Sequence, residues 1–406
     1  MINLKFIIKI SVLFCYSVLM VVLILACHSS TNNLVNKSNF DSTSCVKNYN
    51  PNTDYFPTKI TINYATGLTV KYQKNYKIVT VKKPWQNAET GFQYVLVQCG
   101  TPVPTGFKQT QVITVPVNSI VSLSTTHLPH LAKLGVVDKL IGVRDINRVN
   151  TPEIVEKIKA DKIAAVGNNS SINVEKLLEL NPDLVTTYGE GNPQTDSYAK
   201  LLEVGLKVAI NAEYMETSPL GRSEWLKFTA LFFNKEEQAE KIFSEIARKY
   251  QAIATLAKTT KNRPTVVVGF NFKSTWYTPG GKSYVAKYLA DAGAQYLWND
   301  NQSSGTLPLS FEAVFARAAN ADYWLNQSQT WKNRQDILKE DNRYTEFKAI
   351  KTGNIYNNNA RVKDSGGNDY WESGISNPDI VLSDLIKIFH PQILPNHQLT
   401  YYQKLS

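Results

Sequence analysis

The sequence predicts an α/β fold in which two lobes are joined by one long helix and preceded by a small β region. Three observations lead to this expectation. Short apolar runs alternate with helical patterns from residue 118 onward, and the order strand, polar turn, helix and glycine occurs twice. Between the two occurrences, residues 236–258 form one helical pattern without Gly or Pro. Strands that alternate with helices are typical of parallel sheets.

Residues 1–27 are typical of an export signal. Lys5 and Lys9 precede an apolar stretch that ends at Cys27. This order indicates a secretory signal, and a small residue before the cysteine resembles a bacterial lipoprotein signal peptide with Cys27 as the lipidation site. An uncleaved membrane anchor is the alternative. Both interpretations place the rest of the chain on the periplasmic or cell-surface side, anchored to the membrane.

The cysteine usage agrees with export. Cys15 lies in the signal and Cys27 is the lipid candidate, which leaves Cys45 and Cys99. Exported proteins keep disulfides, so we expect a bond between Cys45 and Cys99.

Residues 28–54 are rich in Ser, Thr and Asn and are expected to form a flexible tether. Residues 55–117 are expected to form the β region. Apolar residues alternate with polar ones there, first at Ile60, Ile62 and Tyr64 and later around residues 70–79 and 94–97. Alternation with Gly and Pro between the runs predicts short strands and hairpins.

The N-terminal α/β lobe is expected over 118–235, the linking helix over 236–260 and the C-terminal lobe over 261–396. Strands are predicted at residues 120–123, 140–143, 184–188, 207–210 and 265–268, and helices at 174–180, 283–292 and 311–319. Each lobe is therefore Rossmann-like. In such sheets, ligands bind beyond the carboxyl ends of the strands, and a cleft between two lobes suits a small ligand.

In the order and spacing of its motifs, the chain resembles the periplasmic binding proteins for ferric siderophores, haem and vitamin B12. These are the class III proteins, whose lobes are joined by a single helix. The resemblance covers about residues 118–395. It is carried by residues 120–127, 140–143, 173–185, 219–225, 276–283, 311–314, 371–379 and 381–391. The β region at 55–117 is not part of the family's usual core.

The resemblance implies an extracytoplasmic component of an ABC importer that binds its solute without covalent chemistry, and therefore not an enzyme. The expected ligand is an iron complex, a ferric siderophore, with vitamin B12 or haem as the alternative and zinc or manganese ions less favoured. The net charge of +10 favours an anionic ligand. A monomer without a resident cofactor is expected. Nucleic acid is not expected, because Lys and Arg are scattered.

Candidate ligand residues follow the predicted strands, because aromatic rings offer flat contact area to a large chelate and Arg offers charge. Ordinary packing is the alternative for each of them. The candidates are Thr125, Thr126, His127, Arg144, Tyr188, Phe270, Trp276, Tyr277, Arg361 and Trp371. A site for a bare metal ion is not expected, because His127 and His130 alone supply too few ligands.

The family also implies docking to the transmembrane subunits of the permease through one glutamate per lobe. The matching positions are Glu175 and Glu312. The alternative is that each glutamate only favours the N-terminus of its own helix.

Two other classes of exported protein are less favoured by the sequence. A hydrolase is disfavoured because no G-x-S-x-G motif occurs. Gly280-Gly-Lys-Ser283 is not a phosphate loop, because Trp276 stands where that motif needs its first glycine. A structural or adhesive lipoprotein is disfavoured by the repeated α/β pattern.

Overall fold

The computed structural model describes residues 41–406, apart from 109–110, 169–170, 193 and 329. The predicted signal peptide with Cys27, and the first part of the predicted tether, lie outside the described residues. None of the described helices combines the length and apolarity that a membrane span requires.

An N-terminal sheet of four strands confirms β structure within 55–117. It contains β1 (Leu68–Tyr72), β2 (Tyr76–Val81), β3 (Phe92–Gln98) and β4 (Val112–Val115), in that order across the sheet. β1–β2 and β2–β3 pair antiparallel, whereas β3–β4 pair parallel. A disulfide joins Cys45 to Cys99 just after β3, with the two Cα atoms 4.7 Å apart.

The strand predicted at Ile60, Ile62 and Tyr64 is wrong, because the structure has no strand there. The backbone N–H groups of residues 63–65 donate to the buried carboxylate of Glu224 instead of to a neighbouring strand. Tyr64 N and Ala65 N both donate to Glu224 Oε2, at 2.6 and 2.8 Å. A segment whose donors are satisfied in this way needs no sheet partner.

The first lobe contains a five-stranded parallel sheet, and its four predicted strands are confirmed. Its order is β7 (Ala164–Ala165), β6 (Leu140–Val143), β5 (Ile120–Ser122), β8 (Leu184–Thr187) and β9 (Val208–Ile210). The helices are α2 (Leu128–Lys133), α3 (Pro152–Lys159), α4 (Val174–Leu180), α5 (Tyr198–Glu203), α6 (Pro219–Glu224) and α7 (Leu226–Leu231).

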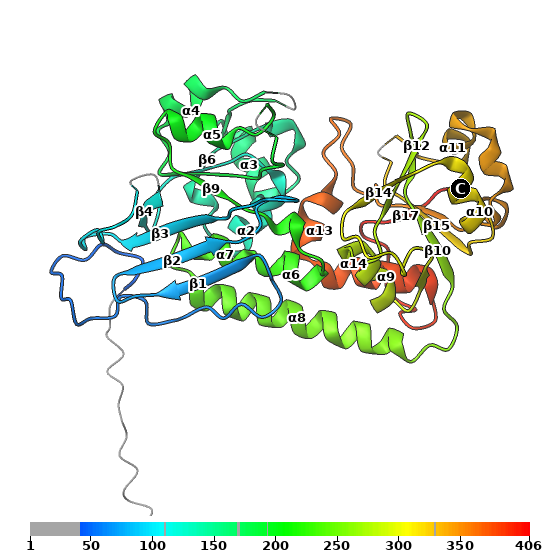
Figure 1. The fold of residues 1–406 in the computed structure, drawn as a ribbon, viewed down its shortest axis with the longest axis horizontal. Coiled ribbons are helices and arrows are strands. Elements are labelled where there is room, and N and C mark those ends of the chain that lie inside the picture. The colour runs from blue at the N-terminus through cyan, green and yellow to red at the C-terminus, as the bar shows by residue number, and fades with distance from the viewer. Residues whose placement is uncertain (1–40, 109–110, 169–170, 193, 329) are drawn as a thin grey trace, which may run out of the picture. The chain divides into compact units, whose positions relative to one another are not determined.

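Helix α8 (Glu236–Lys258) joins the lobes, as the pattern over 236–258 predicts. It packs against α7 of the first lobe and against α9 (Tyr284–Asp291) and α14 (Pro378–Phe389) of the second. Phe243, Ile246 and Tyr250 recur at helical spacing and are buried in these contacts. One helix thus contributes to the cores of both lobes (Figure 1).

The second lobe contains a mixed five-stranded sheet and a small antiparallel sheet. The first has the order β13 (Gln295–Tyr296), β10 (Thr265–Val268), β15 (Tyr323–Asn326), β16 (Ile355–Asn357) and β17 (Gln403–Lys404), with β17 antiparallel. The second contains β11 (Phe270–Phe272), β12 (Thr275–Pro279) and β14 (Thr306–Leu309). The remaining helices are α10 (Phe311–Ala318), α11 (Arg334–Glu340), α12 (Lys348–Thr352) and α13 (Ser373–Ser376).

Short 3-10 helices connect several of these elements. They are η2 (Thr125–His127), η3 (Val137–Lys139), η4 (Ile146–Arg148), η5 (Glu213–Met215), η6 (Asn342–Glu346) and η7 (Asp369–Trp371).

The N-terminal sheet shares its core with the first lobe. Val79 and Tyr94 belong to the same buried cluster as Leu131 and Phe228. Tyr94 Oη also accepts the N–H of Ile210 at 2.8 Å, and buried Lys77 pairs with Glu236 at 2.6 Å. The sheet is therefore held in a defined position against the first lobe and the start of α8.

Candidate functional site

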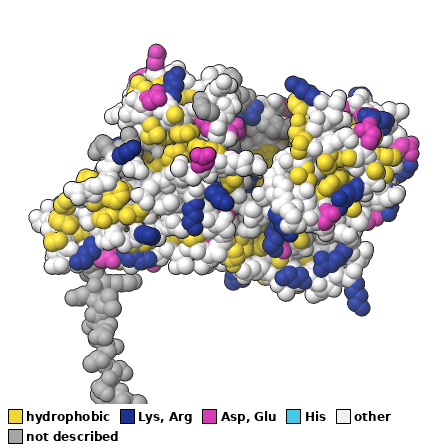
Figure 2. Space-filling model, viewed as in Figure 1, with side chains coloured by type: hydrophobic (Ala, Val, Ile, Leu, Met, Phe, Trp, Pro, Cys, Tyr) yellow, Lys and Arg dark blue, Asp and Glu magenta, His cyan; other side chains and the backbone are white. Residues whose placement is uncertain are grey.

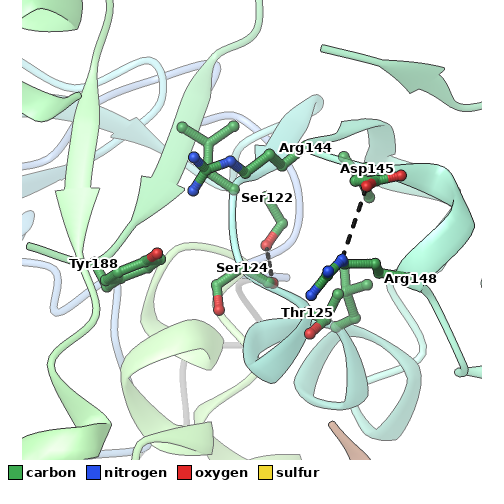
Figure 3. A pocket seen from close by; sticks show the side chains of 10 residues that line it. Ser122, Ser124, Thr125, Arg144, Asp145, Arg148 and Tyr188 are labelled. Atoms are coloured by element: carbon green, nitrogen blue, oxygen red, sulfur yellow. Dashed lines mark hydrogen bonds and ion pairs between the residues drawn. The ribbon is translucent and has the colours of Figure 1, made fainter. Parts of the chain in front are cut away.

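The first cavity lies at the carboxyl ends of β5, β6 and β8. It has a volume of about 210 Å³, and Figure 3 shows most of the side chains around it. The lining residues are Ser122, Leu123, Ser124, Thr125, Leu128, Val143, Arg144, Asp145, Arg148 and Tyr188. Because parallel strands end at one edge of a sheet, the segments that follow them converge there.

The first cavity is rich in cationic and hydroxyl groups. Arg144 Nε donates to the carbonyl of Asn168 at 3.0 Å, and Arg148 lies 3.9 Å from Asp145. Ser122 Oγ donates to the carbonyl of Ser124 at 2.9 Å. Two guanidinium groups beside one carboxylate leave an excess of positive charge that suits a carboxylate, catecholate or hydroxamate oxygen.

A second cavity lies between the lobes and has a volume of about 420 Å³. The first lobe, including η5, contributes Glu190, Tyr214, Met215 and Glu216, and the loop between β2 and β3 contributes Gln86. The second lobe contributes Pro279, Ser283, Tyr284, Val285, Ser304, Gly305, Thr306, Gln327 and Trp371. Among the described residues that line this interlobe cavity there is no Lys or Arg.

The wall of the interlobe cavity rests on a buried ion pair. Arg222 donates to Glu213 with the two charged groups 2.6 Å apart, and its guanidinium lies 4.3 Å from the centre of the Tyr284 ring. The ring of Tyr284 therefore packs against a fixed cation from the other lobe. Burial raises the pKa of the Tyr284 hydroxyl above its ordinary value.

Four of the ten predicted ligand residues line a cavity. Thr125, Arg144 and Tyr188 line the first cavity, and Trp371 lines the interlobe cavity. Thr126 lies next to Thr125 but lines neither cavity; its hydroxyl is 3.0 Å from that of Ser124.

The predictions for His127 and Trp276 are wrong, because both side chains lie in the core. His127 is buried, and burial lowers its pKa to about 3, so it packs there as a neutral ring. Trp276 is fully buried, stacks on Trp324 with ring centres 5.2 Å apart and donates its Nε1–H to the carbonyl of Val268 at 3.1 Å. Neither ring is available to a ligand.

Three further candidates line neither cavity. Arg361 forms an ion pair with Asp369 at 3.0 Å, and Phe270 packs against Trp331. Tyr277 is exposed on β12, two residues before Pro279. Side chains two apart in a strand share a face, so Tyr277 lies on the sheet face that continues from the interlobe cavity.

Sequence reasoning missed several residues that line the cavities. Arg148 and Tyr284 carry suitable chemistry, and Tyr284 directly follows the glycine-rich stretch 280–283. Nothing in the sequence indicates Gln86, because it lies in the β region outside the resemblance.

Glu175 and Glu312 are exposed in the first turns of α4 and α10. Neither side chain caps its helix, because Asn173 caps α4 and Ser310 caps α10. Glu312 lies 3.4 Å from Arg343 and remains 76% exposed. Both carboxylates are therefore accessible to another molecule.

The described residues contain no group of three or more His, Cys, Asp or Glu side chains placed to hold a metal ion.

Comparison with known proteins adds three findings. Residues 120–362 match a family model described as periplasmic binding protein. An uncharacterized lipoprotein of Methanocaldococcus jannaschii is 31% identical over 333 residues, 78% of this chain and 77% of that protein. A vitamin B12-binding protein of Vibrio vulnificus is 34% identical over 95 residues, 23% of this chain and 31% of that protein.

The fold is also similar to solved structures. The structure of a periplasmic binding protein from Veillonella parvula has a TM-score of 0.56 at 17% identity, covering 77% of this chain and 98% of that one. The α/β fold with two lobes predicted from the sequence agrees with this similarity.

Proposed function

The chain belongs to the periplasmic binding protein family, and from this premise we propose that it captures a ferric siderophore between its lobes for an ABC importer. The observation that carries the proposal is the interlobe cavity, whose walls come from the segments that follow strands of both lobes. A ligand that touches both lobes is held by both and stabilises one relative placement of them.

The charge of the first cavity favours an anionic iron complex. Arg144 and Arg148 line it beside Tyr188, which is two residues before Glu190 in the interlobe cavity. The two cavities thus flank one short segment of the first lobe. A chelate bound over residues 188–190 would place its anionic oxygen atoms near the guanidinium groups of Arg144 and Arg148.

A corrinoid such as vitamin B12 is the second candidate. The larger cavity has an exposed carboxylate, Glu190, and no Lys or Arg among its described lining residues. That lining suits a ligand that is neutral or cationic and has many amide groups. The partial similarity to a vitamin B12-binding protein points the same way, and haem remains the further alternative.

Binding without covalent chemistry is part of the proposal. The Ser122 hydroxyl in the first cavity donates to a backbone carbonyl rather than to a histidine. His127 and His130, the histidines near this cavity in sequence, are buried, and His130 Nδ1 lies 3.0 Å from the Thr229 hydroxyl. The Ser122 hydroxyl therefore lacks the adjacent base that a nucleophile needs, and Thr229, whose hydroxyl does lie beside a histidine, lines neither cavity.

Delivery is proposed to use Glu175 and Glu312, one on each lobe, against cationic side chains of the permease. Their exposure, and the presence of other caps on both helices, support this role. Cys27 is the proposed lipid anchor that keeps the chain near that partner. Nucleic acid is not a proposed partner, and Figure 2 shows Lys and Arg spread over the visible face rather than gathered in one patch.

The test is a titration followed by intrinsic fluorescence, for which the chain supplies seven Trp and 21 Tyr. The full chain in detergent is titrated with ferrichrome, ferric enterobactin, haemin and cyanocobalamin, each iron chelate beside its metal-free form. Saturable quenching by a ferric siderophore below about micromolar concentration is expected. Saturation by cyanocobalamin alone would make the ligand a corrinoid, and saturation by haemin alone would make it haem. No response to any probe would contradict the proposal.

A further inference from the structure

The loop between β2 and β3, residues 82–91, reaches the interlobe cavity from the N-terminal sheet. Gln86 is exposed and lines this cavity together with residues of both lobes. A side chain at Gly305 would place its Cβ 3.5 Å from Gln86 Oε1, so the amide lies beside the second lobe. This loop precedes residues 120–362, the part of the chain that matches the family.

Trp85 fixes the loop against the first lobe. Its ring stacks on Tyr198 with centres 5.5 Å apart and meets Phe92 edge-on at 5.9 Å. A Cβ at Gly189 or Gly191 would lie only 2.8 or 2.5 Å from ring atoms of Trp85. The indole therefore rests directly on the backbone of these glycines, and a side chain at either position would displace it.

A hydroxyl group ties the same two segments together. The single O–H of Tyr214 lies within hydrogen-bond distance of two carbonyl oxygens, those of Pro84, at 3.2 Å, and Gly189. The Asp196 carboxylate also accepts the N–H groups of Glu190 and Gly191, each at 2.8 Å. The segment 188–191 is thus held by contacts with both the β2–β3 loop and Asp196.

This segment matters because it borders both cavities. Tyr188 lines the first cavity and Glu190 lines the interlobe cavity. Trp85 packs on Gly189 and Gly191, and this contact fixes where the side chains of Tyr188 and Glu190 lie. The N-terminal sheet therefore adds one lining residue, Gln86, and shapes a segment that supplies two more.

We infer that residues 82–91 form a third wall of the ligand cleft, in which Gln86 donates a hydrogen bond to a carbonyl or carboxylate oxygen at the edge of the chelate. Trp85 is a positioning residue for the segment 188–191. This inference rests on the proposed function. It gives the β region a part in choosing among chelates that differ at their periphery.

The test measures affinities of the full chain by isothermal titration calorimetry with the same four probes. The variants are Gln86→Ala, Trp85→Ala, Trp85→Phe and, as a control, Lys83→Ala, which removes an exposed side chain of the same loop. Thermal melts check that each variant is folded. Because Gln86 is exposed, the melting temperature of Gln86→Ala should differ little from that of the wild type.

The expected result is a roughly 5- to 10-fold weaker affinity of Gln86→Ala for the probe that the wild type binds best. Its preference over the next probe should also shrink, an effect that a purely structural role would not give. Trp85→Ala should weaken binding, and Trp85→Phe should restore most of it. If Gln86→Ala binds with the affinity and preference of the wild type, this inference is overturned and the proposed function stands. If the wild type binds none of the probes, both the proposed function and this inference are overturned.

Discussion

Glu372 of the second lobe accepts hydrogen bonds from both the backbone N–H and the hydroxyl of Thr151 in the first lobe, each at 2.6 Å. Asn150 N donates to the same carboxylate at 2.8 Å. Glu372 and Thr151 are both buried, so their contact joins the two lobes in the protein interior. Burial raises the pKa of Glu372 above its ordinary value, and the hydrogen bonds from Thr151 and Asn150 oppose that rise.

The first prediction follows from this raised pKa. The folded protein binds the Glu372 proton more tightly than the unfolded chain does. The stabilisation that protonated Glu372 contributes is therefore fully present below the pKa of Glu372 in the unfolded chain. It is lost as the pH rises through the pKa of Glu372 in the folded protein. Because Glu372→Gln is neutral at every pH, the melting temperature of the wild type relative to this variant should rise by about 2 °C as the pH falls from 8 to 4. Glu156→Gln, an exposed control, should show no such trend, and a constant difference for Glu372→Gln would contradict the assignment.

The second prediction concerns two buried histidines. Burial lowers the pKa of His127 and His130 to about 3, so the unfolded chain binds their protons more tightly. Keeping the two histidines neutral therefore contributes to the stability of the fold above the unfolded pKa, about 6.5. This contribution is lost as the pH falls toward 3. At pH 4.5 the loss should be roughly 2–3 kcal/mol per histidine. Urea denaturation at pH 7.5 and 4.5 should show a smaller pH effect in His127→Gln/His130→Gln; an equal effect in both proteins would refute the buried, neutral state.

The third prediction concerns Arg144 in the first cavity. Arg144→Ala should weaken binding of an anionic ferric chelate by about 10-fold and reduce its dependence on salt, because a cation near the ligand is removed. Binding of neutral cyanocobalamin should change little. Lys159→Ala removes the same charge from an exposed site of the first lobe and is the control. Unchanged affinity and salt dependence in Arg144→Ala would show that the chelate binds elsewhere.

The fourth prediction separates docking from capture. Glu175→Ala/Glu312→Ala should keep the affinity for the chelate and the melting temperature, because Asn173 and Ser310 still cap the two helices. Uptake of radioactive iron from the chelate by cells should fall at least 10-fold. Glu179→Ala/Glu346→Ala removes two exposed carboxylates and should transport normally. A loss of chelate affinity in the first variant would place those glutamates in the cleft or the fold instead.

The regular elements were predictable because their signals are local. Helix α8 begins at Glu236 and ends at Lys258, where the uninterrupted helical pattern begins and ends. The antiparallel sheet of the second lobe was not predicted, because β11 and β12 are short and follow β10 closely. Without that sheet, Trp276 and Tyr277 look alike in the sequence. The alternation of the strand puts one in the core and the other in solvent, and which face is buried depends on distant residues such as Trp324.

The site itself was only partly predictable. Thr125, Arg144 and Tyr188 follow predicted parallel strands, so their convergence at one edge follows from the fold. Gln86 joins the cleft through the contact of Trp85 with Gly189 and Gly191, which lie about a hundred residues further along the chain. No local pattern encodes such a contact.

The measurement that tests the central claim most directly is native mass spectrometry of the full chain released from detergent after incubation with the best-bound iron chelate. The account predicts one intact metal complex per chain, with the mass of the ligand unchanged after release by denaturation. A bare metal ion on the protein would make it a metal-ion carrier, a ligand of altered mass would make it an enzyme, and either result would contradict the account.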